Sequence, residues 1–148
     1  MKVEALSVIE TAADAAATFR EAAKLAGAQE GFFVLTLDGG GKVLAEPVMV
    51  SLGHKDGTTV VGPKELFKAA FRAGADAIIV AHNHPSGSFG SLTPSKADLH
   101  LTEELKSRAE WLGLEFIDHI ILGAPKIAAG QDFISLAELG VLGTDPTK

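Results

Sequence analysis

Hydrophobic and polar positions divide this chain into short apolar runs and longer mixed segments that carry helix start and stop signals. The apolar runs are rich in aliphatic and aromatic residues and predict strands. The run at 75–82 lacks alternation, which is typical of a strand that is buried on both faces. The predicted strands cover 31–38, 43–53, 58–61, 75–82, 114–123 and 126–130, and the predicted helices cover 7–27, 63–74 and 93–112.

Residues at the ends of these segments set their expected limits. Ser7 followed by Glu10 fits a capping box for the first helix, and Thr93 with Pro94 fits the N-cap and first position of the third. Pro47 lies inside the second predicted strand and indicates an edge position or a bulge. The order of elements predicts an α/β fold: one domain over 1–148, with a single mixed sheet flanked by helices and a loose tail at 143–148.

Length, charge and composition narrow the class of protein. The chain has 148 residues, which suits one domain with a substantial core, and a formal net charge of −6. Because Lys and Arg are scattered singly, nothing indicates a basic face for nucleic acid. The chain has no cysteine, so a transition metal must use His and carboxylate ligands. Neither a signal-peptide core nor a membrane-length apolar run is evident, so we expect a cytoplasmic protein without a membrane partner and leave its oligomeric state open.

The stretch AHNHPSGSFGSLTPSKAD at 81–98 contains the clearest candidate chemistry. His82 and His84 stand one residue apart at the end of an apolar run. Because residues i and i+2 of a strand point to the same face, the two imidazoles are expected to project together. A zinc site with two nitrogen ligands and a polar turn with two hydrogen-bonded rings both fit this spacing.

Asp98 favours the zinc site over the polar turn. In the predicted third helix it shares one face with Leu101, Leu105, Ala109 and Leu112. A carboxylate at the head of an apolar stripe must be paired, protonated or coordinated, because a bare buried charge is costly. Two histidines and one carboxylate leave a fourth position for water, which is the composition of a catalytic zinc site. The alternative is an interaction of Asp98 with the amides of the first helical turn.

The blocks HNHPSG and TPSKAD, preceded by AGADAIIVA and followed by FIDHIILG, resemble the RadC group of the Jab/MPN (JAMM) metallohydrolase superfamily. The resemblance runs from about Glu30 to Leu142, and FISLAELG is similar to that group's usual ending. It implies an MPN-type, cytidine-deaminase-like arrangement in three layers. It also implies zinc-dependent hydrolysis of a peptide or isopeptide bond in a protein or peptide substrate, with one Zn²⁺ held by His82, His84 and Asp98.

The resemblance also assigns two catalytic residues. Glu30, at the entry to the first strand, matches the superfamily's glutamate best, and Glu46 is the second choice. The glutamate would take a proton from the attacking water and pass it to the leaving amine. Ser95 matches the superfamily's serine and would donate a hydrogen bond to the oxyanion.

Two features depart from the family pattern. Thirteen residues separate His84 from Asp98, whereas the family leaves about ten. Three more residues in a surface loop cost little closure entropy, so we still expect Asp98 to reach the metal. RadC proteins usually carry an N-terminal helix-hairpin-helix region, for which this chain is expected to have no room, so DNA repair receives little support. A metal-free MPN scaffold is the main rival function, and nucleic-acid binding is the third.

The other histidines have simpler expected roles. His54 lies in the polar stretch GHKDG, where we expect it to be solvated. His100 follows Asp98 by two residues and should face away from it. His119 is expected to be a hydrogen-bonded strand residue, or alternatively a partner of a metal ligand.

Replacing the assigned general base tests the mechanism that the resemblance implies. Glu30→Gln is expected to keep zinc binding and to lose cleavage of linked or C-terminally tagged peptides, because the amide accepts no proton at neutral pH. Parallel measurements of zinc content and cleavage rate check this. A variant with normal zinc and an unchanged rate would show that the base is a different residue.

Overall fold

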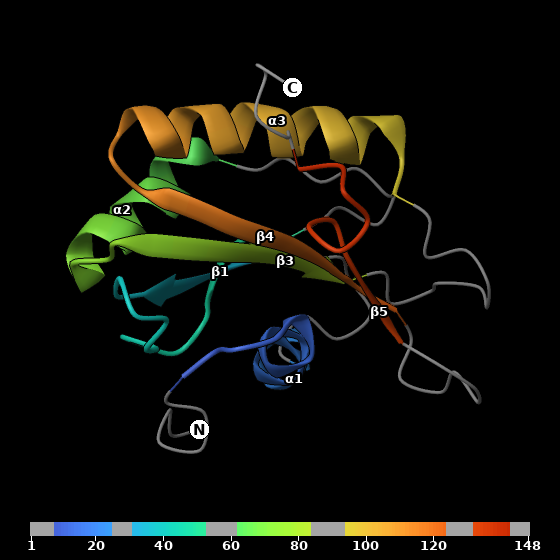
Figure 1. The fold of residues 1–148 in the computed structure, drawn as a ribbon, viewed down its shortest axis with the longest axis horizontal. Coiled ribbons are helices and arrows are strands. Elements are labelled where there is room, and N and C mark those ends of the chain that lie inside the picture. Colours follow the sequence, from blue (N-terminus) through green and yellow to red (C-terminus); the bar gives the residue numbers. More distant parts are fainter. Residues whose placement is uncertain (1–7, 25–30, 53–61, 84–93, 124–131, 143–148) are drawn as a thin grey trace.

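The computed structural model describes residues 8–24, 31–52, 62–83, 94–123 and 132–142. Over these ranges, five strands form one mixed sheet and three helices cover it, so the predicted α/β fold is confirmed (Figure 1). The elements are α1 (Ala12–Ala23), β1 (Gly31–Leu37), β2 (Val48–Leu52), α2 (Pro63–Ala73), β3 (Ala77–Asn83), α3 (Lys96–Trp111), β4 (Glu115–Leu122) and β5 (Phe133–Ser135).

The strand order β2-β1-β3-β4-β5 places β3, which carries His82, in the middle of the sheet. β3 and β4 are parallel, and the other neighbouring pairs are antiparallel. His82 lies opposite Phe32 of β1 and Ile121 of β4. β2 is an edge strand, as Pro47 predicted, but it begins only at Val48, so the proline precedes the strand.

Side chains that alternate along the strands bury both faces of the sheet. α1 covers the face that includes Phe33 and Ile79, and α2 and α3 cover the face that includes Phe32 and Val80 (Figure 1). β1 and β3 are therefore buried at every position. For β3 this agrees with the apolar run without alternation.

α1 begins later than the capping box at Ser7 predicted, so that prediction is wrong. Thr11 is the N-cap: its hydroxyl accepts the Asp14 N–H at 3.1 Å, and Asp14 Oδ2 accepts the Thr11 N–H at 3.1 Å. The residues before the cap pair with the β1–β2 connection instead, since the Ile9 N–H donates to the Gly41 carbonyl at 2.9 Å. The helix starts where the chain leaves that pairing.

α3 begins at Lys96, and its N-cap is Ser95 instead of the predicted Thr93. Ser95 has extended backbone angles, and its Oγ accepts the Asp98 N–H at 3.0 Å. Asp98 Oδ2 in turn accepts the Ser95 N–H at 3.0 Å, which completes a capping box. The residue three positions after Thr93 is Lys96, which cannot accept such a bond.

The buried face of α3 differs from the predicted stripe at two positions. Leu105 and Ala109 are buried, as expected, but Leu112 is 37% exposed because it is the C-cap. Thr102, which the stripe did not include, is 2% exposed and faces the sheet.

Predicted segments 58–61, 126–130 and 143–148 lie outside the described residues. The strand that pairs with the end of β4 is β5, which belongs to the FISLAELG block. In the described part of the chain, no helix has both the length and the apolar character that a membrane crossing needs.

Substitution of the two candidate caps tests where α1 starts. Thr11→Ala is expected to lower the free energy of unfolding by about 1 kcal/mol, because the Asp14 N–H loses its acceptor. Ser7→Ala is the matched control and is expected to leave it unchanged. Urea denaturation followed by circular dichroism measures both, and the opposite order would place the cap at Ser7.

Candidate metal centre

β3 delivers His82 to the side of the sheet that α2 and α3 cover. The side chain is 2% exposed, and its ring stacks on Phe32 with 6.0 Å between centroids and 7° between planes. β1 and β4 pair with β3 on either side, so the backbone that carries the imidazole is held in the centre of the sheet. This combination leaves the ring little freedom to turn.

The first turn of α3 brings Asp98 to this ring. Asp98 Oδ1 lies 3.6 Å from His82 Nε2, which is beyond hydrogen-bond distance. The carboxylate therefore caps the helix through Oδ2 and faces the imidazole through Oδ1. The long segment between His84 and Asp98 does not keep the carboxylate away from His82.

The separation of these two atoms suits a shared metal ion. Two ligands of a tetrahedral zinc ion at about 2.0–2.2 Å lie roughly 3.4 Å apart. The observed 3.6 Å is close to that value and exceeds the ~2.8 Å of a charge-assisted hydrogen bond between an imidazolium and a carboxylate. An imidazole nitrogen and a carboxylate oxygen are also ligand types that zinc accepts in a chain without cysteine.

Comparison with known proteins gives the family. The sequence model of the family described as the RadC-like JAB domain matches residues 9–141 of this chain. This range includes β3, α3 and the pair His82–Asp98. The chain belongs to the RadC-like JAB domain family.

Curated relatives of this JAB domain are known from several bacteria. A UPF0758 protein of Staphylococcus haemolyticus is 46% identical over 101 residues, which are 68% of this chain and 42% of the relative. A UPF0758 protein of Acaryochloris marina is 43% identical over 129 residues, which are 84% of this chain and 49% of the relative. This JAB domain thus spans about half the length of the curated relatives it matches, and their names state no activity.

The remaining predicted site residues fall into two groups. His84 and Glu30 lie outside the described residues, as does His54. Ser95 caps α3 beside Asp98, and Glu46 is exposed on the segment before β2. Within the ranges that the structure describes, no three side chains of the metal-binding types gather at one point. Two of the three predicted ligands, His82 and Asp98, are described and lie together.

Behind His82, the JAB domain holds a buried pair of side chains from two other elements. His119 Nε2 of β4 lies 2.8 Å from His82 Nδ1, and His119 Nδ1 lies 2.6 Å from Thr102 Oγ1 of α3. His119 is therefore a hydrogen-bonded strand residue, as predicted, and its partner is the predicted ligand. Thr102 was not among the predicted site residues, although its i+4 spacing from Asp98 was a usable signal. His100 is 74% exposed and pairs with Glu104 at 3.2 Å, so it faces away as predicted.

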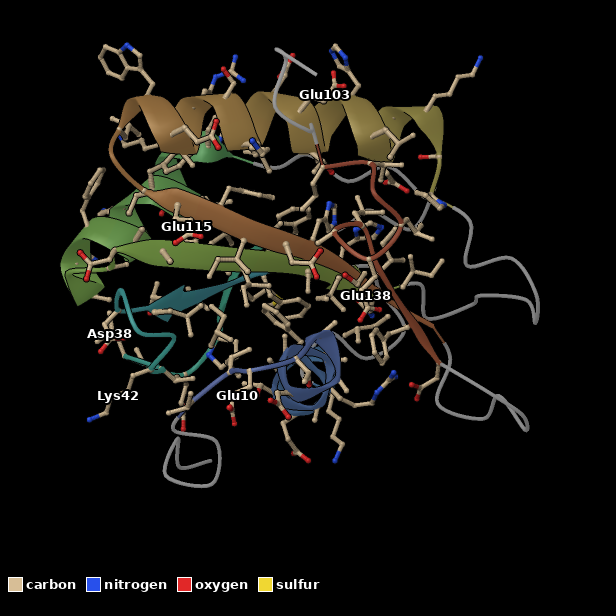
Figure 2. The ribbon with its side chains drawn as sticks, in the orientation of Figure 1. Glu10, Asp38, Lys42, Glu103, Glu115 and Glu138 are labelled. Atoms are coloured by element: carbon tan, nitrogen blue, oxygen red, sulfur yellow. The ribbon has the colours of Figure 1, made fainter. Side chains whose placement is uncertain are left out.

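Asp118, the neighbour of His119, ties β4 to the turn after β5. Its carboxylate accepts the backbone N–H groups of His119 at 2.7 Å and Ala137 at 2.9 Å, and the Ser135 hydroxyl at 2.5 Å. Burial raises the pKa of the Asp118 carboxyl above its usual range, while these three hydrogen bonds lower it. The Glu138 carboxylate on the same turn adds to the rise in the pKa (Figure 2).

An apolar groove lies between α2 and α3 at the opposite end of the JAB domain from Asp98. It encloses about 410 Å³ and is lined by residues that include Phe67, Trp111 and Leu112. Trp111 ends α3, whereas Asp98 lies in its first turn, so about 20 Å of helix separates them. The groove is therefore separate from the candidate metal centre.

Two substitutions at Asp118 test whether its hydrogen bonds support the fold behind His82. Asp118→Ala is expected to lower the free energy of unfolding by about 2–4 kcal/mol, because it leaves buried donors without an acceptor. Asp118→Asn keeps an acceptor for the two backbone N–H groups and adds no charge, so a loss of about 1 kcal/mol is expected. Denaturant unfolding at pH 7 compares them. Equal losses would mean that the negative charge, which both variants remove, and not the acceptor for the backbone N–H groups gives Asp118 its effect.

Proposed function

We propose that this JAB domain is a zinc-dependent hydrolase of peptide or isopeptide bonds, with one Zn²⁺ held by His82, His84 and Asp98. The observation that carries the proposal is the 3.6 Å approach of Asp98 Oδ1 to His82 Nε2. Membership of the RadC-like JAB domain family supports it. When bound, zinc supplies a water whose pKa is lowered to about 7 and polarises the scissile carbonyl.

The residues at the end of β3 and the start of α3 suit this role through their charge. His82 and His84 supply neutral nitrogen ligands and Asp98 supplies one negative oxygen, so the set cancels only half the charge of Zn²⁺. Asp98 reaches the site with its carboxylate already oriented, because Oδ2 is held by the Ser95 N–H. A ligand held in this way loses little rotamer freedom on binding.

The register of the sheet favours Glu30 over Glu46 as the proton acceptor. The N–H of Gly31, the residue after Glu30, donates to Asn83 Oδ1 at 2.7 Å, and Asn83 directly follows His82. Glu46 precedes β2, whose first residue, Val48, pairs with Val34 in the middle of β1. Phe32, near the start of β1, pairs with His82, so Glu46 lies farther from His82 than the start of β1 does. In the proposed reaction the water oxygen bonds to the carbonyl carbon, the C–N bond breaks, and Glu30 transfers a water proton to the leaving amine nitrogen.

Ser95 suits the proposed role of oxyanion donor. Its Oγ is the acceptor in the bond from the Asp98 N–H, so capping the helix does not use the hydroxyl hydrogen. Ser95 is also exposed, which allows contact with a substrate. A hydroxyl held beside a metal ligand is preorganised for charge that develops in the transition state.

Asp98→Asn tests the metal centre while sparing the helix cap. The asparagine side chain still accepts the Ser95 N–H, but it loses the negative charge that faces His82. The affinity for Zn²⁺ is expected to fall by more than about 100-fold, since even residues behind the ligands contribute about 10–100-fold. Zinc titration by calorimetry measures the affinity, and cleavage of linked peptides with and without a chelator measures the activity.

The capping box of α1 provides a matched control for this experiment. Thr11 and Asp14 form the same pair of hydrogen bonds as Ser95 and Asp98, so Asp14→Asn reports the effect of the cap alone. It is expected to leave zinc affinity and cleavage unchanged. A wild-type protein that binds no zinc and shows no chelator-sensitive cleavage would contradict the hydrolase and support the metal-free scaffold.

A further inference from the structure

We infer that Thr102 and His119 are positioning residues that hold the His82 imidazole with its hydrogen on Nδ1, so that Nε2 presents a lone pair toward Asp98. The inference deepens the proposed function and rests on it in one respect, namely that Nε2 is the atom that binds the metal. The three side chains come from three different elements, α3, β4 and β3, and form one chain of hydrogen bonds.

The direction of this chain is set at Thr102. Its Oγ1 lies 2.6 Å from the Asp98 carbonyl oxygen and 2.6 Å from His119 Nδ1. A carbonyl oxygen only accepts, so an oxygen–oxygen contact this short is attractive only if the hydroxyl hydrogen lies within it. The threonine therefore donates to the carbonyl and meets His119 Nδ1 with a lone pair.

The next two steps follow from the chemistry of neutral imidazole, in which one nitrogen donates and the other accepts. His119 Nδ1 faces an acceptor, so it carries the hydrogen, and His119 Nε2 has the lone pair. His82 Nδ1, at 2.8 Å from that lone pair, must then donate to it. His82 Nε2 is left as the acceptor, 3.6 Å from the Asp98 carboxylate.

A lone pair and a carboxylate oxygen that face each other repel unless a cation lies between them. The 3.6 Å separation of His82 Nε2 and Asp98 Oδ1 is too long for a hydrogen bond and agrees with this assignment. The chain of hydrogen bonds thus prepares the His82 ring for a metal, because the hydrogen is already on Nδ1 and leaves Nε2 for the metal.

Burial keeps this chain of hydrogen bonds in one arrangement. His82 and Thr102 are each 2% exposed, and His119 has no exposed surface. Phe32 stacks on the His82 ring and meets the His119 ring edge-on, with 5.5 Å between their centroids. The backbone N–H of His119 also donates to Asp118 Oδ1 at 2.7 Å, which holds the strand position that carries the ring. A flip of either ring would break a buried hydrogen bond, which costs about 1–3 kcal/mol.

Nitrogen-15 NMR of the metal-free wild-type protein at pH 8 tests the assignment directly, because protonated and unprotonated imidazole nitrogens have distinct shifts. The expected spectrum shows both His82 and His119 with hydrogen on Nδ1 and none on Nε2. A His82 ring with its hydrogen on Nε2 would overturn the inference. This readout needs neither bound zinc nor enzymatic activity.

Two variants of Thr102 test the effect of the chain on metal binding. Thr102→Val keeps the side-chain volume and removes the hydroxyl, so His119 loses its acceptor at Nδ1. We expect mixed tautomers at His119 and His82 and a zinc affinity about 10–100-fold lower. Thr102→Ser restores the hydroxyl and is expected to restore the wild-type tautomers and most of the affinity. Thermal unfolding shows whether each variant is folded.

The outcomes separate this inference from the proposed function. If the wild type has the expected tautomers but binds no zinc, the inference about His82 stands and the proposed metal centre fails. If the wild type binds zinc and Thr102→Val leaves tautomers and affinity unchanged, the metal centre stands and the positioning role is contradicted.

Discussion

The approach of His82 Nε2 to Asp98 Oδ1 is the contact on which the account of this JAB domain depends. It joins the middle strand of the sheet to the first turn of α3, two elements connected by a long segment of chain. The contact exists because Leu105 and Ala109 hold α3 against the sheet and because Ser95 fixes the first helical turn. Packing and capping together thus place a carboxylate beside an imidazole.

Asp98 caps α3 and faces His82 at the same time. Its two oxygens have separate partners: Oδ2 caps the helix, and Oδ1 faces His82. The helix-cap and ligand interpretations are therefore compatible, and the cap holds the carboxylate in the orientation that the proposed ligand needs. α1 has the same capping box with Thr11 and Asp14, and no histidine of the described residues contacts that carboxylate, which shows that the motif alone is an ordinary helix start.

Much of this arrangement could be predicted from the sequence because it depends on local patterns. Unbroken apolar runs identified β1 and β3, and helical spacing placed Asp98 on the inner face of α3. α2 begins at Pro63 as predicted, but the starts of α1 and α3 were misplaced because two cap-like residues lie close together at each. Tertiary pairing of Ile9 decides between them at α1, and the capping box of Ser95 with Asp98 decides at α3. The contact of Thr102 with His119 depends on how α3 crosses β4, which no local pattern specifies.

The most direct test of the central claim is a crystal structure grown with zinc, with anomalous diffraction recorded at the zinc absorption edge. The account predicts one strong peak between β3 and α3, about 2.0–2.2 Å from both His82 Nε2 and Asp98 Oδ1. A well-ordered pair of side chains with no anomalous peak between them, or a peak that Asp98 does not contact, would contradict it.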